Sequence, residues 1–237
     1  KQAGAKTANT KIYVDGVLVS SALEGVDTAP SITSSPVRIG SLDGASGRFW
    51  NGMIDEVRYY NRVLIPNEIT QLASQSQRCE IAPPSDYVAY WKFENNFNDE
   101  SANNNDGVGV GGVGFASGKS GLGAVFNGSN YVNVLDSNSL DLTSLTISAW
   151  VRPNSVALFF GSGILTKGRG SSSPYSYRLF VTNSTNTTGS NFLPRAYLAS
   201  TGISSKSNDS AFLSISSWNH VVVTFTPNDI ETGCPVP

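Results

Sequence analysis

The chain has 237 residues, of which 14% are charged, and its formal net charge at pH 7 is −2. This length allows one large β-sandwich or two small domains, each with a sizeable core. The near-neutral charge, without blocks of Lys or Arg, argues against nucleic acid and anionic membranes as partners, and no apolar run reaches membrane-spanning length.

The first predicted element is a β-hairpin at residues 11–19, where a favoured Asp-Gly turn separates two β-branched runs. A short strand is predicted at 37–40. Residues 49–69 predict a glycine-led strand, a turn and a short helix that opens at Pro66, because proline has no N–H to lose at the first helical position. Together with 23 glycines and abundant Ser, Asn and Thr, these signals favour an all-β protein with many turns.

Residues 76–86 contain a Pro-Pro pair and are predicted to be a linker. After them, residues 87–94 alternate, with Trp91 and Phe93 on one face and Lys92 on the other. An Asn/Asp/Gly-rich loop is predicted up to about residue 123. Further strands are predicted at 124–126, 131–134, 145–151, 164–165, 177–181, 195–199 and 218–225. No long helix is predicted.

Two sets of motifs in this chain resemble one family. Residues 49–69 resemble the closing segment of the laminin-G-like, or concanavalin-A-like, jelly-roll family, which typically reads F-x-G-x-I-D-E-V-R-I-Y-N-R-A-L-S-x-x-E-I. Later motifs resemble the first half of that family, and they lie at 90–94, 121–132, 145–151 and 218–225. The resemblance implies an all-β jelly-roll sandwich of two antiparallel sheets. It also implies that the family's C-terminal half precedes its N-terminal half here.

The predicted organisation follows from that order. Residues 1–75 form the C-terminal half of a laminin-G-like sandwich, 76–86 the linker, 87–228 the N-terminal half and 229–237 a tail. The sandwich is permuted and closes within one chain, or each half is completed by a neighbouring chain, or the chain is a piece of a tandem array. A complete sandwich, permuted or strand-exchanged, is favoured because half a sandwich exposes long apolar edges.

No catalytic constellation is visible in the sequence. Retaining glucanases need two carboxyl groups on either side of the scissile bond, whereas Asp55 and Glu56 are adjacent and on a strand point to opposite faces. His220 lies in the middle of a predicted strand, where the family keeps a structural histidine. With Cys79 and Cys234 in remote loops, no credible Cys-His or Ser-His constellation is predicted. The chain is therefore predicted not to be an enzyme. A polysaccharide-degrading enzyme with an unrecognised site is the remaining catalytic alternative.

A structural Ca²⁺ is predicted with Asp55, Asp99 and Asp106 as ligands. Asp55 is expected on the core face of its strand, where a carboxylate needs backbone N–H groups, an arginine or a cation. The loop at 98–107 is rich in the oxygen ligands that Ca²⁺ prefers, and related jelly rolls often hold this ion. The alternative is that its Asn and Asp residues only favour turns.

Exposed aromatic rings are the expected sugar platforms of a lectin-type site. Trp50, Tyr175 and Tyr177 are the predicted ligand-binding rings, because they stand at a strand entry or after a Ser-rich loop. The other three tryptophans, Trp91, Trp150 and Trp218, lie in strand motifs and are predicted to be core residues.

Cys79 and Cys234 both lie in proline-rich, loop-like stretches. They are predicted either to form a disulfide, within or between chains, or to remain free thiols; no metal-ligand spacing is present.

The predicted function is a non-catalytic binding or adhesion module, extracellular or on the cell surface, that binds carbohydrate and is stabilised by Ca²⁺. The expected partner is a glycan or another surface protein, with neither nucleic acid nor a membrane span. The alternative is a structural subunit of a surface filament, which self-associates through strand exchange between sandwich halves.

Overall fold

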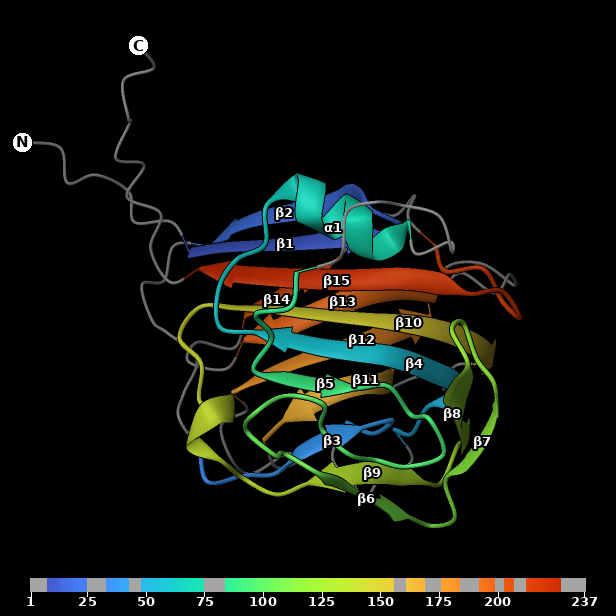
Figure 1. The fold of residues 1–237 in the computed structure, drawn as a ribbon. Coiled ribbons are helices and arrows are strands. Elements are labelled where there is room, and N and C mark those ends of the chain that lie inside the picture. The colour runs from blue at the N-terminus through green and yellow to red at the C-terminus, as the bar shows by residue number, and fades with distance from the viewer. Residues whose placement is uncertain are drawn as a thin grey trace, which may run out of the picture.

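The computed structural model describes residues 8–24, 33–42, 48–74, 84–155, 161–168, 176–183, 192–198, 203–206 and 212–226. These residues form two antiparallel β-sheets that face each other in a sandwich (Figure 1). The predicted all-β jelly-roll architecture is confirmed. Among the described residues, no helix is long and apolar enough to cross a membrane.

The first sheet, sheet A, has eight described strands in the order β2-β1-β15-β10-β4-β8-β7, with β5 also paired to β4. Their bounds are β1 Ala8–Val14, β2 Val17–Glu24, β4 Asn51–Tyr60, β5 Ala89–Trp91, β7 Gly114–Ser117, β8 Leu122–Asn127, β10 Leu145–Ser155 and β15 Asn219–Thr226. The predicted hairpin is confirmed, because Asp15 and Gly16 between β1 and β2 both have positive φ, as a tight hairpin turn requires.

The second sheet, sheet B, has seven described strands in the order β14-β13-β12-β11-β3-β9-β6. Their bounds are β3 Val37–Ile39, β6 Gly107–Val110, β9 Tyr131–Val134, β11 Ser162–Lys167, β12 Tyr177–Asn183, β13 Phe192–Leu198 and β14 Ile203–Lys206. A short 3₁₀ helix, η1 (Asn138–Leu140), follows β9.

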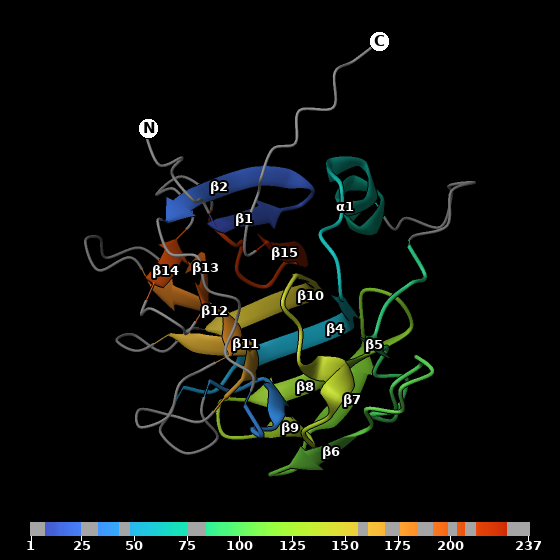
Figure 2. The same cartoon turned by 90° about the vertical axis from the view of Figure 1, so that its left-hand side faces the viewer.

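Both sheets of the one chain contain strands from the two predicted halves. In sheet A, β1 pairs with β15 from Asn9↔Thr226 to Val14↔Val221, and β4 lies between β10 and β8 (Figure 2). In sheet B, β3 lies between β11 and β9. The sandwich therefore closes within a single chain. That the order of the halves is reversed relative to the family stays a prediction.

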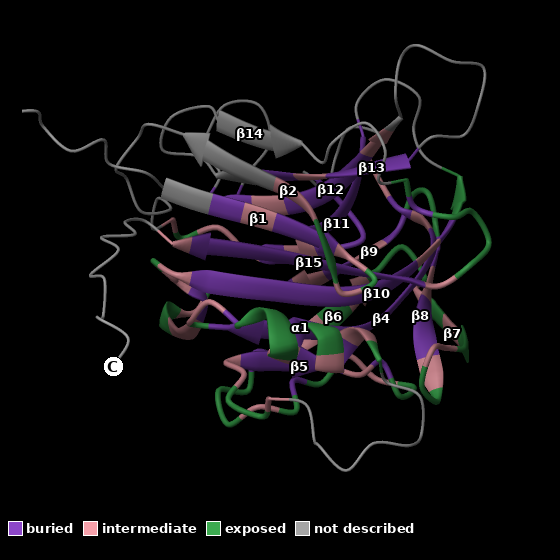
Figure 3. Ribbon diagram, turned by 90° about the horizontal axis from the view of Figure 1, so that it is seen from above, coloured by how far each residue is buried: buried purple, intermediate pink, exposed green. Residues whose placement is uncertain are grey.

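A single apolar core lies between the sheets. The central strands β10 and β15 are buried over most of their length (Figure 3). Residues of short strands show which face meets it: Val37 and Ile39 of β3 are in the core and Arg38 is not, and Val132 and Val134 of β9 alternate in the same way. Each large apolar side chain buried here stabilises the fold by about 1.5–3 kcal/mol. The intervening residues mark the outer face of sheet B.

The outer face of sheet A is covered in part by helix α1 (Pro66–Ala73). Ile69 and Leu72 of α1 pack with Tyr60, Tyr13 and other sheet residues in a second apolar cluster. Pro66 opens the helix as predicted, and the Glu68 carboxylate accepts a hydrogen bond from the Ile65 N–H at 2.9 Å. This bond satisfies one of the N–H groups that a helix start leaves unpaired.

Three features differ from the prediction. The predicted loop before residue 123 contains two strands, β6 and β7, whose glycine-rich sequences have weak strand propensity and pair with β9 and β8. The strand predicted at 87–94 is limited to β5. Trp218, predicted to be core, is half-buried, because it precedes β15 rather than lying in it.

Candidate functional site

The predicted aromatic ligand site is not assembled. Trp50 is a core residue, and Tyr177 is buried against Tyr59, with ring centroids 5.5 Å apart, while its hydroxyl donates a hydrogen bond to the Leu140 carbonyl at 2.9 Å. The prediction that these two rings are exposed is wrong, because both side chains point between the sheets. Tyr175 lies outside the described residues, as do both cysteines, Cys79 and Cys234.

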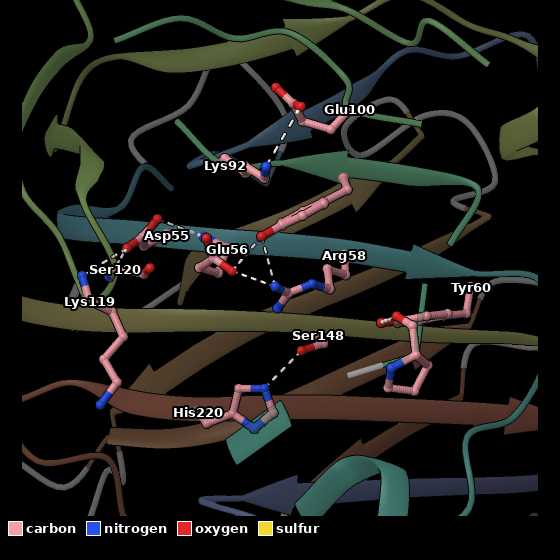
Figure 4. A network of polar contacts seen from close by, with 12 residues as sticks. Asp55, Glu56, Arg58, Tyr60, Lys92, Glu100, Lys119, Ser120, Ser148 and His220 are labelled. Atoms are coloured by element: carbon pink, nitrogen blue, oxygen red, sulfur yellow. Dashed lines mark hydrogen bonds and ion pairs between the residues drawn. The ribbon is translucent and has the colours of Figure 1, made fainter. Parts of the chain in front are cut away.

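Asp55 lies on the outer side of β4, not on the predicted core face. Glu56 has a left-handed φ of 52°, and the register with β10 shifts between Ser148 and Trp150, so a β-bulge reverses the expected alternation. The Asp55 carboxylate accepts hydrogen bonds from the N–H groups of Glu56 at 2.8 Å, Lys119 at 2.7 Å and Ser120 at 3.0 Å (Figure 4). Backbone N–H groups are therefore the partners of this buried acid.

The Asp55 carboxylate fastens the turn between β7 and β8 to β4. A Cβ at Gly118 would lie 2.6 Å from the Asp55 Oδ2 atom, so only glycine lets the turn approach this closely. Burial, together with the charge of Glu56, raises the pKa of Asp55, and the three N–H groups oppose the rise, so that the pKa is about 7.

Glu56 takes part in a second buried group beside Asp55. Its carboxylate forms an ion pair with Arg58 (Figure 4). Arg58 also donates a hydrogen bond to the Tyr90 hydroxyl at 2.7 Å. The expectation that Asp55 and Glu56 point to opposite faces is thus wrong, since the bulge brings both to the outer side of β4. Both carboxylates are nevertheless occupied by protein donors, which leaves neither free to act as the acid or nucleophile of a glycosidase.

Ser148 and His220 form a pair that the sequence did not reveal. Ser148 Oγ lies 2.8 Å from His220 Nε2, because β10 and β15 are neighbours, and both residues are 0% exposed. Burial, with the nearby charges of Arg58 and Lys119, lowers the pKa of His220 to about 3. Within the described residues, His220 Nδ1 has no hydrogen-bond partner. The pair therefore lacks both the orienting acid and the substrate access of a nucleophilic site.

The predicted calcium ligands are already occupied by protein donors. Asp99 accepts hydrogen bonds from the N–H groups of Tyr90, Ser101 and Asn105, each within 2.9 Å, and Asp106 accepts one from the Asp99 N–H at 2.8 Å. In the part of the chain that the structure describes, no three His, Cys, Asp or Glu side chains gather to hold a metal ion. Asp55, Asp99 and Asp106 therefore do not fit a shared Ca²⁺ site.

The outer face of sheet B presents a different set of groups. Tyr131 and Asn133 of β9 point outward, and the Phe49 ring stacks on Tyr131 with centroids 6.1 Å apart. Arg38 of β3 lies beside Asn133 in register. All four side chains are half-buried. We call Phe49, Tyr131, Asn133 and Arg38 the outer platform.

The sequence contained a signal for these residues. The patterns Val-Arg-Ile at β3 and Tyr-Val-Asn-Val at β9 alternate, so each strand has one core face and one outer face. The alternation does not predict that β3 pairs with β9. This pairing joins segments almost a hundred residues apart and places the polar faces of the two strands side by side.

A comparison with protein families matches residues 4–70 and 126–232 of this chain to the family model described as the concanavalin A-like lectin/glucanases superfamily. No curated protein and no solved structure matches the chain.

Proposed function

Because the chain belongs to the concanavalin A-like lectin/glucanases superfamily, we propose that it is a non-catalytic module that binds carbohydrate on the outer platform of sheet B. The observation that carries the proposal is the platform itself, where a stacked ring pair, an amide and a guanidinium share one accessible face. Sugar sites combine an apolar surface with a few oriented polar groups in this way.

The polar part of the platform is oriented in advance. Arg38 donates a hydrogen bond from Nη1 to the Gly168 carbonyl at 3.0 Å, which holds the guanidinium and uses one of its five N–H donors. Asn133, on the neighbouring strand, has a carbonyl acceptor and an amide donor, so the two side chains complement hydroxyl groups, which both donate and accept. Preorganised groups bind with a smaller loss of conformational entropy.

The non-catalytic part of the proposal is supported by the outer side of sheet A. The acids Asp55 and Glu56 are held by protein donors, and the Ser148–His220 pair is fully buried. These groups link the strands β4, β5, β10 and β15 to one another, so their role is structural.

An extracellular or cell-surface location is part of the same proposal, since glycans displayed on surfaces are the partners that such a module would meet. The predicted filament is the less favoured reading, because β1 finds its partner β15 within its own chain. A single-chain mass in light scattering is expected, and a stable dimer or fibre would favour the filament instead.

Glycan-array screening, followed by isothermal titration calorimetry, tests the proposal. Tyr131→Ala removes one ring of the stack and is expected to weaken binding of the best glycan about fivefold, since an aromatic contact contributes roughly 1 kcal/mol. Trp218→Ala, which removes a half-buried ring preceding β15, is the matched control and is expected to leave affinity within about twofold. If no glycan is retained, or if only Trp218→Ala weakens binding, the proposal fails.

A further inference from the structure

β6, the last described strand at one end of sheet B, turns its apolar side chains away from the core (Figure 1). Its sequence Gly-Val-Gly-Val places Val108 and Val110 on the outer face of the sheet, where they are 65% and 37% exposed. The glycines face inward, and a Cβ at Gly109 would lie 2.7 Å from the Cε2 atom of Phe97. The core side of β6 therefore has no room for a larger side chain there, while its valines are displayed to solvent.

The stability of the fold does not explain these outward valines. An exposed valine gains little from burial, and an apolar edge strand invites pairing with wrong partners. Threonine has the same branched shape and a similar preference for strands, but a polar surface. An exposed apolar patch beside polar groups is instead typical of a surface that contacts a ligand.

The two valines extend the outer platform onto β6. The register pairs Val108 with Asn133, and it pairs Val110 with Tyr131. Side chains that lie directly opposite each other have Cβ atoms about 5 Å apart. The two pairs are two residues apart along each strand, so about 7 Å separates one pair from the other.

The Asn133 amide is available to a ligand on this face. Asn133 lies between Val108 and Arg38 in register and is half-buried. Within the described residues, its side chain makes no hydrogen bond. Its carbonyl can accept a hydrogen bond and its NH₂ group can donate one. The Val108–Asn133 pair therefore combines an apolar contact with both of the partners that another amide group needs.

We propose that the Val108–Asn133 pair makes the outer platform selective for glycans that carry N-acetyl groups, that is, 2-acetamido sugars. An acetamido group joins a methyl to an amide, so the methyl contacts Val108 while the amide bonds to Asn133. The sugar ring stacks on Tyr131, about 7 Å along the strand. A hydroxyl at the same position of the sugar has neither the methyl nor the carbonyl. This inference rests on the proposed carbohydrate-binding function and names its ligand class.

Calorimetry with two oligosaccharides that share one β-1,4 backbone tests the inference. Chitohexaose carries an acetamido group on every sugar, and cellohexaose carries a hydroxyl at the same position. Chitohexaose is expected to bind about tenfold more tightly, because one methyl contact and one hydrogen bond distinguish the two ligands. The preference should persist at roughly 0.5 M salt, because neither contact involves a net charge on the ligand.

Three variants locate the preference. Val108→Ser replaces two methyl groups by one hydroxyl and is expected to weaken chitohexaose binding about fivefold, with less than about twofold change for cellohexaose. Val17→Ser makes the same change at a valine of sheet A that is 64% exposed, and should leave both affinities unchanged. Asn133→Leu keeps the approximate size of the side chain, removes its amide and is expected to abolish the preference. Circular dichroism checks that each variant is folded.

The outcomes separate the two proposals. If cellohexaose binds as tightly as chitohexaose, or if the array retains only glycans without acetamido groups, the selectivity is wrong and the carbohydrate-binding function stands. If Val108→Ser and Val17→Ser weaken chitohexaose binding equally, or if Asn133→Leu keeps the preference, the pair is not the site. A dimer in light scattering that Val108→Ser disperses would mean that a second copy covers the valines, and the inference fails. If neither oligosaccharide nor any glycan on the array binds, the proposed function itself fails.

Discussion

At Asp55, burial and hydrogen bonding act on one carboxylate in opposite directions. Desolvation favours the protonated acid, while the N–H groups of Glu56, Lys119 and Ser120 favour the anion, and the pKa settles near 7. The sequence predicted that a buried acid here needs partners, and it named backbone donors among them. It could not predict the turn that supplies two of them, because residues 118–121 are remote in the chain.

Asp55→Asn tests the pH dependence that this pKa implies. The pKa is about 7 in the folded protein and near 3.8 in the unfolded chain. Between these values the folded protein keeps a proton that the unfolded chain releases, so the free energy of unfolding falls as pH rises, by about 1.4 kcal/mol per pH unit. The melting-temperature advantage of the native chain over Asp55→Asn should therefore decline from pH 4 to pH 7. An advantage that is constant over this window would contradict the assignment.

His220 has the opposite dependence. Its pKa is about 3 in the folded protein, against 6.5 in the unfolded chain, so the free energy of unfolding falls as pH drops from 6.5 towards 3. His220→Gln keeps a hydrogen-bonding side chain next to Ser148 but removes the titration. Thermal unfolding should therefore show a variant that loses less stability on acidification than the native protein. Equal losses in both proteins would mean that His220 becomes protonated without unfolding.

Among the elements, β4 was predicted most clearly from the sequence, but the face on which Asp55 lies was predicted wrongly. The stretch from residue 49 to 69 predicted a strand and a helix at Pro66, and both are present. The bulge at Glu56 was not predictable, because it arises from the shift between Ser148 and Trp150 on the partner strand. Local alternation thus identified the strand but assigned Asp55 to the wrong face.

Gly52 is the position in β4 where the backbone geometry is most demanding. Its φ is 142°, and a Cβ there would lie 2.2 Å from the Arg152 carbonyl oxygen. Gly52→Ala is expected to destabilise the fold by about 3 kcal/mol, because alanine rarely adopts this φ and its Cβ would clash with the Arg152 carbonyl oxygen. Urea unfolding measures the change, with Gly114→Ala as control, because a Cβ at Gly114 meets no atom within 4 Å. A similar loss of unfolding free energy in the two variants would show that position 52 does not require glycine more than position 114 does.

At the scale of the whole molecule, the important result is that the described strands of both sheets come from one chain. The sequence predicted a complete sandwich but left open whether its halves meet within or between chains. That choice depends on long-range pairings such as β1 with β15 and β3 with β9, which no local pattern contains. The outer platform escaped prediction for the same reason.

A rearranged chain tests the closure. Asn9 and Thr226 pair directly across β1 and β15, so a short glycine-serine turn can join Thr226 to Asn9, with new ends opened within residues 75–83. Because every described strand pairing is kept except that of Ala8 with Glu24 at the end of β1, the rearranged chain should remain monomeric and melt within about 5 °C of the native protein. Light scattering and circular dichroism measure both properties. An aggregated or molten product would contradict closure within the chain.

The pairing of β1 with β15 also dictates when this domain can fold during its synthesis. β1 is made long before its partner β15, the last described strand, and β4 must likewise wait for β8 and β10. Such non-local pairing slows folding and leaves strand edges open to wrong partners. The early strands of this domain therefore stay without their sheet partners until β15 has been made.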